Sequence, residues 1–176
     1  NLDWAMQARR HDAALVMLYD SASKTMLHFG VAYNQNDESL SETIYTLNNY
    51  KTFQYAYFLK PLGNYSLSFL FLNNGFQYTD KSTNPVTNKT VFSQTFGPRI
   101  AYKKPESKFS WNSTFYFQIG SNRTNQSLFA YDFLAEVAYQ LSDQFSLTSG
   151  IEILSGTSQL SNNTEKSKSF DPLFGT

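Results

Sequence analysis

Hydrophobic and polar residues alternate along most of this chain, which is the pattern that a β-strand with two unlike faces produces. Within residues 108–119, Phe115 and Phe117 fall on one face of the predicted strand, while Thr114 and Gln118 fall on the other. Strand character is predicted for residues 8–19, 26–34, 50–60, 65–77, 91–103, 108–119, 128–140 and 145–156. We therefore expect an all-β chain in which about eight strands form an antiparallel sheet.

The polar stretches between these segments are predicted to alternate in length. Tight connections, rich in turn-forming residues, are expected at residues 20–25, 61–64, 104–107 and 141–144. Longer polar stretches occupy residues 35–49, 78–90, 120–127 and 157–169. Short turns on one side and long loops on the other are typical of outer-membrane β-barrels, whose short turns are periplasmic and whose long loops are extracellular.

Aromatic residues stand next to the tight connections, at Tyr19, Tyr65, Tyr102, Phe109, Tyr139 and Phe145. Strands that span a bilayer carry girdles of aromatic side chains at the membrane interface, where a ring can be apolar at one end and wet at the other. The predicted segments also reach the roughly 9 to 11 residues that a tilted strand needs to cross the hydrocarbon. We therefore predict the wall of a transmembrane β-barrel in the outer membrane of a Gram-negative bacterium.

The composition agrees with this prediction. The longest apolar run, Ala13–Tyr19, is far shorter than the roughly 18 to 20 residues of a membrane-spanning helix. The mean hydropathy is −0.42, yet 17% of the residues are aromatic. A chain that is polar on average but rich in Phe and Tyr is what strands with an apolar outer face and a polar inner face produce.

The alternation assigns side chains to two faces. Those predicted to face lipid are Phe115, Phe133, Val137 and Ile151. Those predicted to line the lumen are Arg10, Asp12, Arg99, Lys103, Asp132, Glu136 and Glu152. Alternation alone does not say which face is inside, so a soluble or surface barrel that binds an apolar ligand in its interior is the alternative.

Several stretches resemble the alginate-export porin family, particularly members from Bacteroidetes-type bacteria. They are residues 3–13 (DWAMQARRHDA), 48–52 (NNYKT), 71–77 (FLNNGFQ) and 170–176 (FDPLFGT), with residues 139–145 (YQLSDQF) in a hairpin form common to many outer-membrane barrels. The resemblance runs nearly end to end, and its motifs are structural. It implies a barrel of about 18 strands, of which this chain would supply under half. We accordingly expect a barrel segment that is incomplete at both ends.

The resemblance also implies polysaccharide passage, which the predicted lumen allows us to weigh. A passage for a polyanion is expected to present a lane of Arg and Lys. The predicted lining carries both signs of charge, and the formal net charge of the chain is zero. The simpler interpretation of these charges is that they form ion-pair networks that hold the shape of the barrel. The sequence therefore predicts a channel for passive passage of small solutes or polysaccharide.

Catalytic and metal-binding patterns are sparse. The chain has no cysteine, and its histidines are His11 and His28, so a barrel-embedded hydrolase would need one of these as its base. Asp37, Glu38 and Glu42 have oxygen ligands of the kind that a divalent cation prefers, but solvated loop acids are the simpler interpretation. We expect no enzyme activity, no cofactor and no nucleic-acid partner. The expected partners are outer-membrane lipid and a small solute or polysaccharide.

Overall fold

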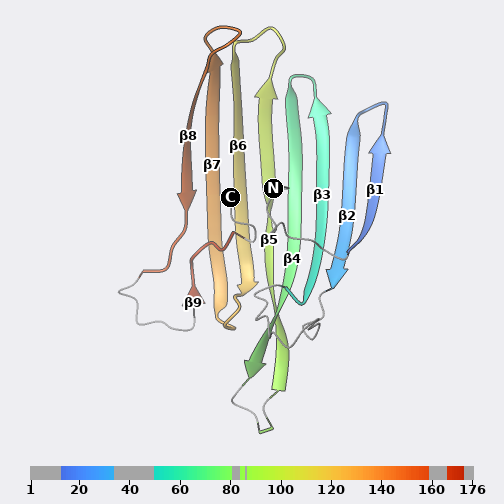
Figure 1. Cartoon of the computed structure of the whole chain (residues 1–176), viewed down its shortest axis with the longest axis vertical. Coiled ribbons are helices and arrows are strands. Elements are labelled where there is room, and N and C mark those ends of the chain that lie inside the picture. Colours follow the sequence, from blue (N-terminus) through green and yellow to red (C-terminus); the bar gives the residue numbers. More distant parts are fainter. Residues whose placement is uncertain (1–12, 34–49, 81–83, 86, 159–165, 173–176) are drawn as a thin grey trace, which may run out of the picture.

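The computed structural model describes residues 13–33, 50–80, 84–85, 87–158 and 166–172, and throughout these ranges the regular structure is β. The strands are β1 (Ala13–Asp20), β2 (Thr25–Tyr33), β3 (Thr52–Leu62), β4 (Tyr65–Asp80), β5 (Thr87–Lys103), β6 (Phe109–Ser121), β7 (Ser127–Gln140), β8 (Ser146–Leu154) and β9 (Lys166–Ser167). They belong to one sheet (Figure 1). The prediction of an all-β chain is confirmed.

Strands β1 to β8 follow one another across the sheet in chain order, and each is antiparallel to the next. The short β9 instead pairs in parallel with the start of β7. No pairing joins β1 to β8 among the described residues, so the sheet is open, as expected from the sequence. The predicted segments match β2 to β8 apart from shifts at their ends, whereas residues 8–12 of the first segment lie outside the described residues.

Short connections join the strands at one end of the sheet, as predicted. They are residues 21–24, 63–64, 104–108 and 141–145. The connection of residues 63–64 is a two-residue hairpin loop, because Leu62 and Tyr65 form the last pair of the ladder. Gly63 adopts a φ of 62° there, a left-handed conformation that favours glycine.

The prediction of long loops at the other end was wrong in two places. Residues 78–90 are mostly strand, because β4 runs to Asp80 and β5 begins at Thr87. Cross-strand contacts stabilise this polar ribbon: the Thr79 hydroxyl donates to Asn88 Oδ1 at 3.1 Å, and Lys89 Nζ lies 2.7 Å from Asp80 Oδ2. The ribbon projects beyond the neighbouring strands in Figure 1.

The second correction concerns the stretch predicted as a loop at residues 120–127. The structure has only five connecting residues there, 122–126, because β6 continues to Ser121 and β7 begins at Ser127. The Asn122 side chain closes this turn by accepting hydrogen bonds from the backbone of Thr124 and Gln126. The stretch predicted at residues 35–49 lies outside the described residues.

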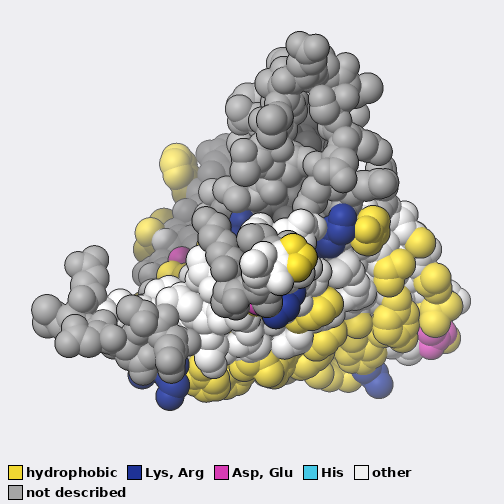
Figure 2. Space-filling model, turned by 90° about the horizontal axis from the view of Figure 1, so that it is seen from below, with side chains coloured by type: hydrophobic (Ala, Val, Ile, Leu, Met, Phe, Trp, Pro, Cys, Tyr) yellow, Lys and Arg dark blue, Asp and Glu magenta, His cyan; other side chains and the backbone are white. Residues whose placement is uncertain are grey.

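The two faces of the sheet differ in exposure. We call the face that carries Thr114, Gln118 and Ala130 the inner face, and the face that carries Phe115 and Phe133 the outer face. In the described ranges, the buried residues other than glycine all lie on the inner face by register: Ala32, Phe53, Ser68, Asn74, Phe76, Ser93, Thr95, Thr114, Gln118, Leu128 and Ala130. Hydrophobic side chains line the lower side of the sheet in Figure 2.

Candidate functional site

Exposed hydrophobic side chains cover the outer face across the whole width of the sheet. They include Val16, Phe29, Phe69, Phe71, Ile100, Phe109, Phe129, Tyr131, Val137, Tyr139, Leu147, Ile151 and Ile153. The ladder places some of them opposite one another, as with Tyr139 and Leu147, and Phe109 and Tyr139. Half-buried rings lie between them on the same face: the ring centroids of Phe115 and Phe133 are 6.3 Å apart. The four residues predicted to face lipid all lie on this outer face.

A row of aromatic side chains marks one margin of the apolar surface, beside the tight turns. Tyr65 lies 5.1 Å from Tyr102 and 6.4 Å from Trp111, between ring centroids, and Tyr102 stacks on Trp111. Phe109 and Tyr139 are partners in the adjoining ladder. These aromatic residues share the outer face, and Phe145 is exposed in the turn that precedes β8.

Tyr19 differs from the other residues of the predicted girdle. It pairs with Met26, which places it on the inner face with His28. The β1 residues from Ala13 to Asp20 are exposed on both faces because β1 is an edge strand of the described sheet. A strand that is apolar on both faces gives no alternation from which its register could be predicted, so the sequence did not separate Tyr19 from the others.

A polar row marks the other margin of the apolar surface. The Asn73 amide donates to Gln54 Oε1 at 2.6 Å, and the Gln94 amide donates to Asn73 Oδ1 at 2.7 Å. Gln54 also donates to Thr52, so the row crosses β3, β4 and β5 on the outer face. On β6, ten residue steps separate Phe109 from Ile119. At a rise of about 3.3 Å and a tilt near 45° they cover about 23 Å, close to the roughly 25 Å apolar band of outer-membrane barrels.

The predicted lumen-lining residues that the structure describes are Arg99, Lys103, Asp132, Glu136 and Glu152, and all of them lie on the inner face. The basic residues lie on β5, the acidic residues on β7 and β8, and neutral β6 side chains lie between them. The Asn112 amide donates to Glu136 Oε2 at 3.0 Å. Arg10 and Asp12 lie outside the described residues.

The five described charges do not form the ion-pair network that the sequence predicts. Among the described residues, none of the five charged side chains is in an ion pair. Arg99, Lys103, Asn112 and Glu136 instead border a shallow depression of about 190 Å³. The inner face thus carries positive and negative charges on separate strands.

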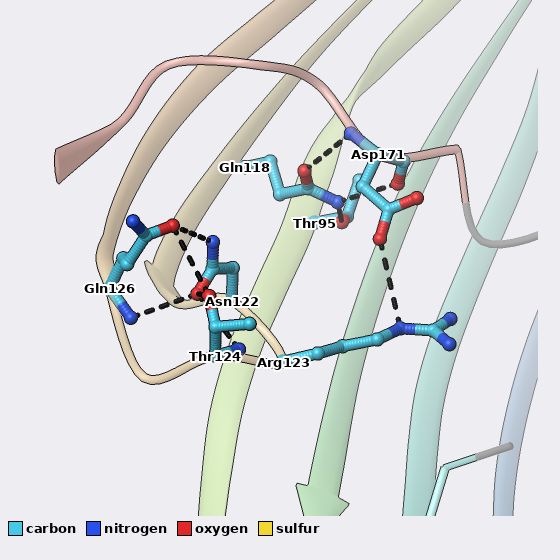
Figure 3. A network of polar contacts seen from close by, with 7 residues as sticks. All are labelled: Thr95, Gln118, Asn122, Arg123, Thr124, Gln126 and Asp171. Carbon is cyan, nitrogen blue, oxygen red and sulfur yellow. Dashed lines mark hydrogen bonds and ion pairs between the residues drawn. The ribbon is translucent and has the colours of Figure 1, made fainter. Parts of the chain in front are cut away.

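A further polar site, which the sequence did not reveal, lies where the end of the described chain crosses the inner face (Figure 3). We call residues 166–172 the inner segment. Gln118 Nε2 donates to the Asp171 carbonyl at 3.0 Å, and the Asp171 N–H donates to Gln118 Oε1 at 2.9 Å. Gln118 Nε2 also lies 3.0 Å from the hydroxyl of Thr95, to which it donates. In the sequence, Gln118 was one of many polar residues at alternating positions.

Arg123 lies beside this contact. Its guanidinium lies 4.6 Å from the centroid of the Phe76 ring, and its Nε lies 3.9 Å from Asp171 Oδ2. A depression of about 310 Å³ separates the inner segment from the wall here and is bordered by Arg123, Gln118, Phe170 and Asp171. The contact with Asp171 links the turn of residues 122–126 to the inner segment, and the contact with Phe76 links the same turn to β4.

His28 is the histidine whose surroundings the structure describes. His28 lies on the inner face of β2 with its ring 6.0 Å from that of Tyr57, edge to face. In the part of the chain that the structure describes, no carboxylate hydrogen-bonds His28, and no group of three or more His, Asp or Glu side chains could hold a metal ion. His11 and the acidic residues 37, 38 and 42 lie outside that part.

The described residues contain no helix that is both long and apolar enough to cross a membrane. No protein-family model, curated protein or solved structure matches the chain. The resemblance to alginate-export porins therefore stays a prediction from the sequence.

Proposed function

We propose that this chain forms part of the wall of an outer-membrane β-barrel channel that lets small solutes pass passively. The observation that carries the proposal is the apolar outer face, which stays exposed across all eight long strands while the buried side chains lie on the other face. Soluble monomers rarely expose a contiguous apolar patch larger than a few hundred Å². Lipid is the surrounding that makes such a surface favourable.

The margins of the outer face support the same proposal. Tyr65, Tyr102 and Trp111 lie at the tight-turn end, where a periplasmic interface would be, and Asn73 lies near the opposite margin. The apolar residues between these rows would contact acyl chains. The polar ribbon of β4 and β5 beyond Asn73 would then extend into water on the extracellular side.

The inner face supports a wet passage more than a pocket for an apolar ligand. Its most deeply buried large side chains are Gln118 and Asn74, both amides, whereas a soluble barrel that binds an apolar ligand fills its interior with apolar side chains. In the proposed channel, the barrel excludes lipid, the lumen holds water, and charged side chains set selectivity. Further strands would pair with the open edges of β1 and β8.

The charge arrangement favours neutral or cationic solutes over a polyanion. Asp132, Glu136 and Glu152 lie on two neighbouring strands of the inner face. Confined negative charge raises the entry barrier for an anion, and Arg99 and Lys103 lie on a different strand. Transport of a polyanionic polysaccharide, which the resemblance implies, is for this reason the weaker form of the proposal.

Reconstitution tests the proposal directly. The intact protein should need detergent to stay monodisperse and should produce stepwise conductance in a planar bilayer. Reversal potentials under a salt gradient should indicate preference for cations. Protein that remains monodisperse without detergent and produces no conductance would contradict the proposal and favour the soluble alternative.

A further inference from the structure

Residues 166 and 167 of the inner segment form β9, which pairs with the sheet, whereas residues 168–172 are not part of any strand of the proposed wall. The chain leaves the sheet after β8, and β9 then pairs with Ser127 and Leu128 at the start of β7. The Phe170 N–H donates to the Ser155 carbonyl at 3.1 Å, which holds the departing and returning parts of the chain together. From there the segment reaches Gln118 on β6, so it crosses the inner face of β7.

Gln118 holds the crossing segment by its main chain. Its side-chain amide both donates to and accepts from Asp171, in the way that two strand residues exchange hydrogen bonds. Because these bonds involve the backbone of Asp171, they fix the path of the segment independently of which side chain stands at 171. Gln118 is 1% exposed, so its side chain is buried beneath the crossing segment.

The wall residues next to this contact are withdrawn from solvent. Ala130 pairs with Gln118 in the ladder and is 0% exposed, and Leu128 is 5% exposed. In a water-filled lumen, inner-face positions of a wide barrel would be wet. Phe170 and Leu128 border the same depression, so the inner segment occupies space next to the wall that solute would otherwise use.

We infer that the inner segment is a constriction of the proposed channel, and that Gln118 is the positioning residue that fixes it and thereby sets the size limit for neutral solutes. The inference rests on the proposed function. Releasing the segment should widen the passage without removing any strand from the wall. The effect should therefore fall on conductance and size limit.

Substitution of Gln118 by Leu tests the contact with little change in side-chain volume. We expect the variant of the intact protein to have a larger single-channel conductance in planar bilayers and to admit longer maltooligosaccharides in liposome swelling. Gln94→Leu is the matched control, because Gln94 lies on the adjacent strand but on the outer face, where it bonds Asn73. The control should keep the wild-type conductance and size limit.

Gln118→Glu provides a second variant in case the Leu variant does not fold. Its ionised carboxylate can accept from the Asp171 N–H but cannot donate to the Asp171 carbonyl, whereas the protonated acid can do both. Conductance relative to wild type at the same pH should be raised near neutrality and should return toward wild type in acid. A merely structural role for Gln118 would not produce this reversal.

A chemical block locates the segment without disturbing its contacts. The chain has no cysteine, so Lys168→Cys introduces a single thiol on the inner segment, and Lys104→Cys introduces one in a tight turn. A bulky maleimide should reduce conductance of the Lys168→Cys channel and leave the Lys104→Cys channel unchanged.

The outcomes separate the two proposals. Wild-type protein that forms no channel overturns both. A conducting wild type whose conductance and size limit are unchanged in Gln118→Leu or Gln118→Glu, and whose Lys168→Cys variant is not blocked, overturns the constriction alone.

Discussion

The outer and inner faces of this sheet are built from alternate residues of the same strands, yet different forces hold them. Outer-face side chains such as Phe115 and Phe133 contact each other through their rings and stay half-exposed. Inner-face side chains such as Gln118 and Asn112 form directed hydrogen bonds. Apolar contacts do not depend on one exact partner geometry, which suits the lipid contact proposed for the outer face. Directed bonds are specific, so the inner face can hold a defined polar structure.

The two faces should differ most in how much an introduced charge lowers the free energy of unfolding. Ile151→Arg places a charge on the outer face of β8, where it should reduce the free energy of unfolding by about 2 to 4 kcal/mol near the bilayer midplane. Thr148→Arg is the matched inner-face control on the same exposed strand and should cost much less. Denaturant titration of the protein folded in lipid vesicles measures both.

Thr148 is a better control than Thr114, which alternation alone would also place in water. Thr114 is 7% exposed, so Arg there would be costly for steric reasons whichever face is wet. Equal losses for Ile151→Arg and Thr148→Arg would contradict the assignment of the outer face to lipid.

Gly97 on β5 lies so close to β6 that a larger residue there should lower the free energy of unfolding. A Cβ at Gly97 would lie 1.8 Å from the Phe115 carbonyl oxygen, which is backbone and cannot rotate away. Gly97→Ala should therefore cost about 1 to 3 kcal/mol, as overpacking typically does. Unfolding in lipid vesicles again measures the loss. Gly63→Ala, with nothing within 4 Å of the added Cβ, isolates the smaller effect of a left-handed backbone, and a larger loss at Gly63 would contradict the predicted order.

The polar row on the outer face should contribute less to the free energy of unfolding than the close packing at Gly97. Asn73→Leu removes the bonds to Gln54 and Gln94, and a typical net hydrogen bond contributes about 1 kcal/mol. We expect a loss of about 1 kcal/mol, because water at a membrane margin can satisfy the two remaining amides. Phe71→Leu, two residues nearer the aromatic row, is the apolar control. If Asn73→Leu lowers the free energy of unfolding by much more than about 1 kcal/mol, the polar row lies within the hydrocarbon and not at its margin.

Much of the sheet could be predicted from the sequence, because the two faces of a strand have different surroundings and alternate residues differ accordingly in polarity. Phe115, Phe133, Val137 and Ile151 could be assigned to one face from periodicity alone, and the ladder agrees. Where alternation fails, prediction failed: the polar ribbon at residues 78–90 has strand structure without an apolar face.

The inner segment could not be predicted for a different reason. Its contact joins Gln118 to Asp171, which are 53 residues apart, through the backbone of Asp171. Almost any residue can form such backbone hydrogen bonds, so the residue type at 171 gives no sign of them. Gln118 itself matched the general preference for polar residues on the inner face, so nothing in the sequence distinguished it from Thr114 or Asn112.

Charge reversal on the inner face should change stability least of all the substitutions and should change ion selectivity strongly. Glu136→Lys with Glu152→Lys reverses two charges on the inner face, where wet side chains tolerate either sign, so stability should change little beyond the loss of the Asn112 bond. Reversal potentials under a salt gradient should move toward anion preference, because confined charge sets the entry barrier. Glu106→Lys with Asp143→Lys makes the same net change at exposed turn residues and should move the potential much less. If the two pairs shift the potential equally, net charge near the pore mouth controls selectivity and the inner-face carboxylates do not line the path. If neither pair shifts it, conduction follows a wall formed by other strands of the barrel.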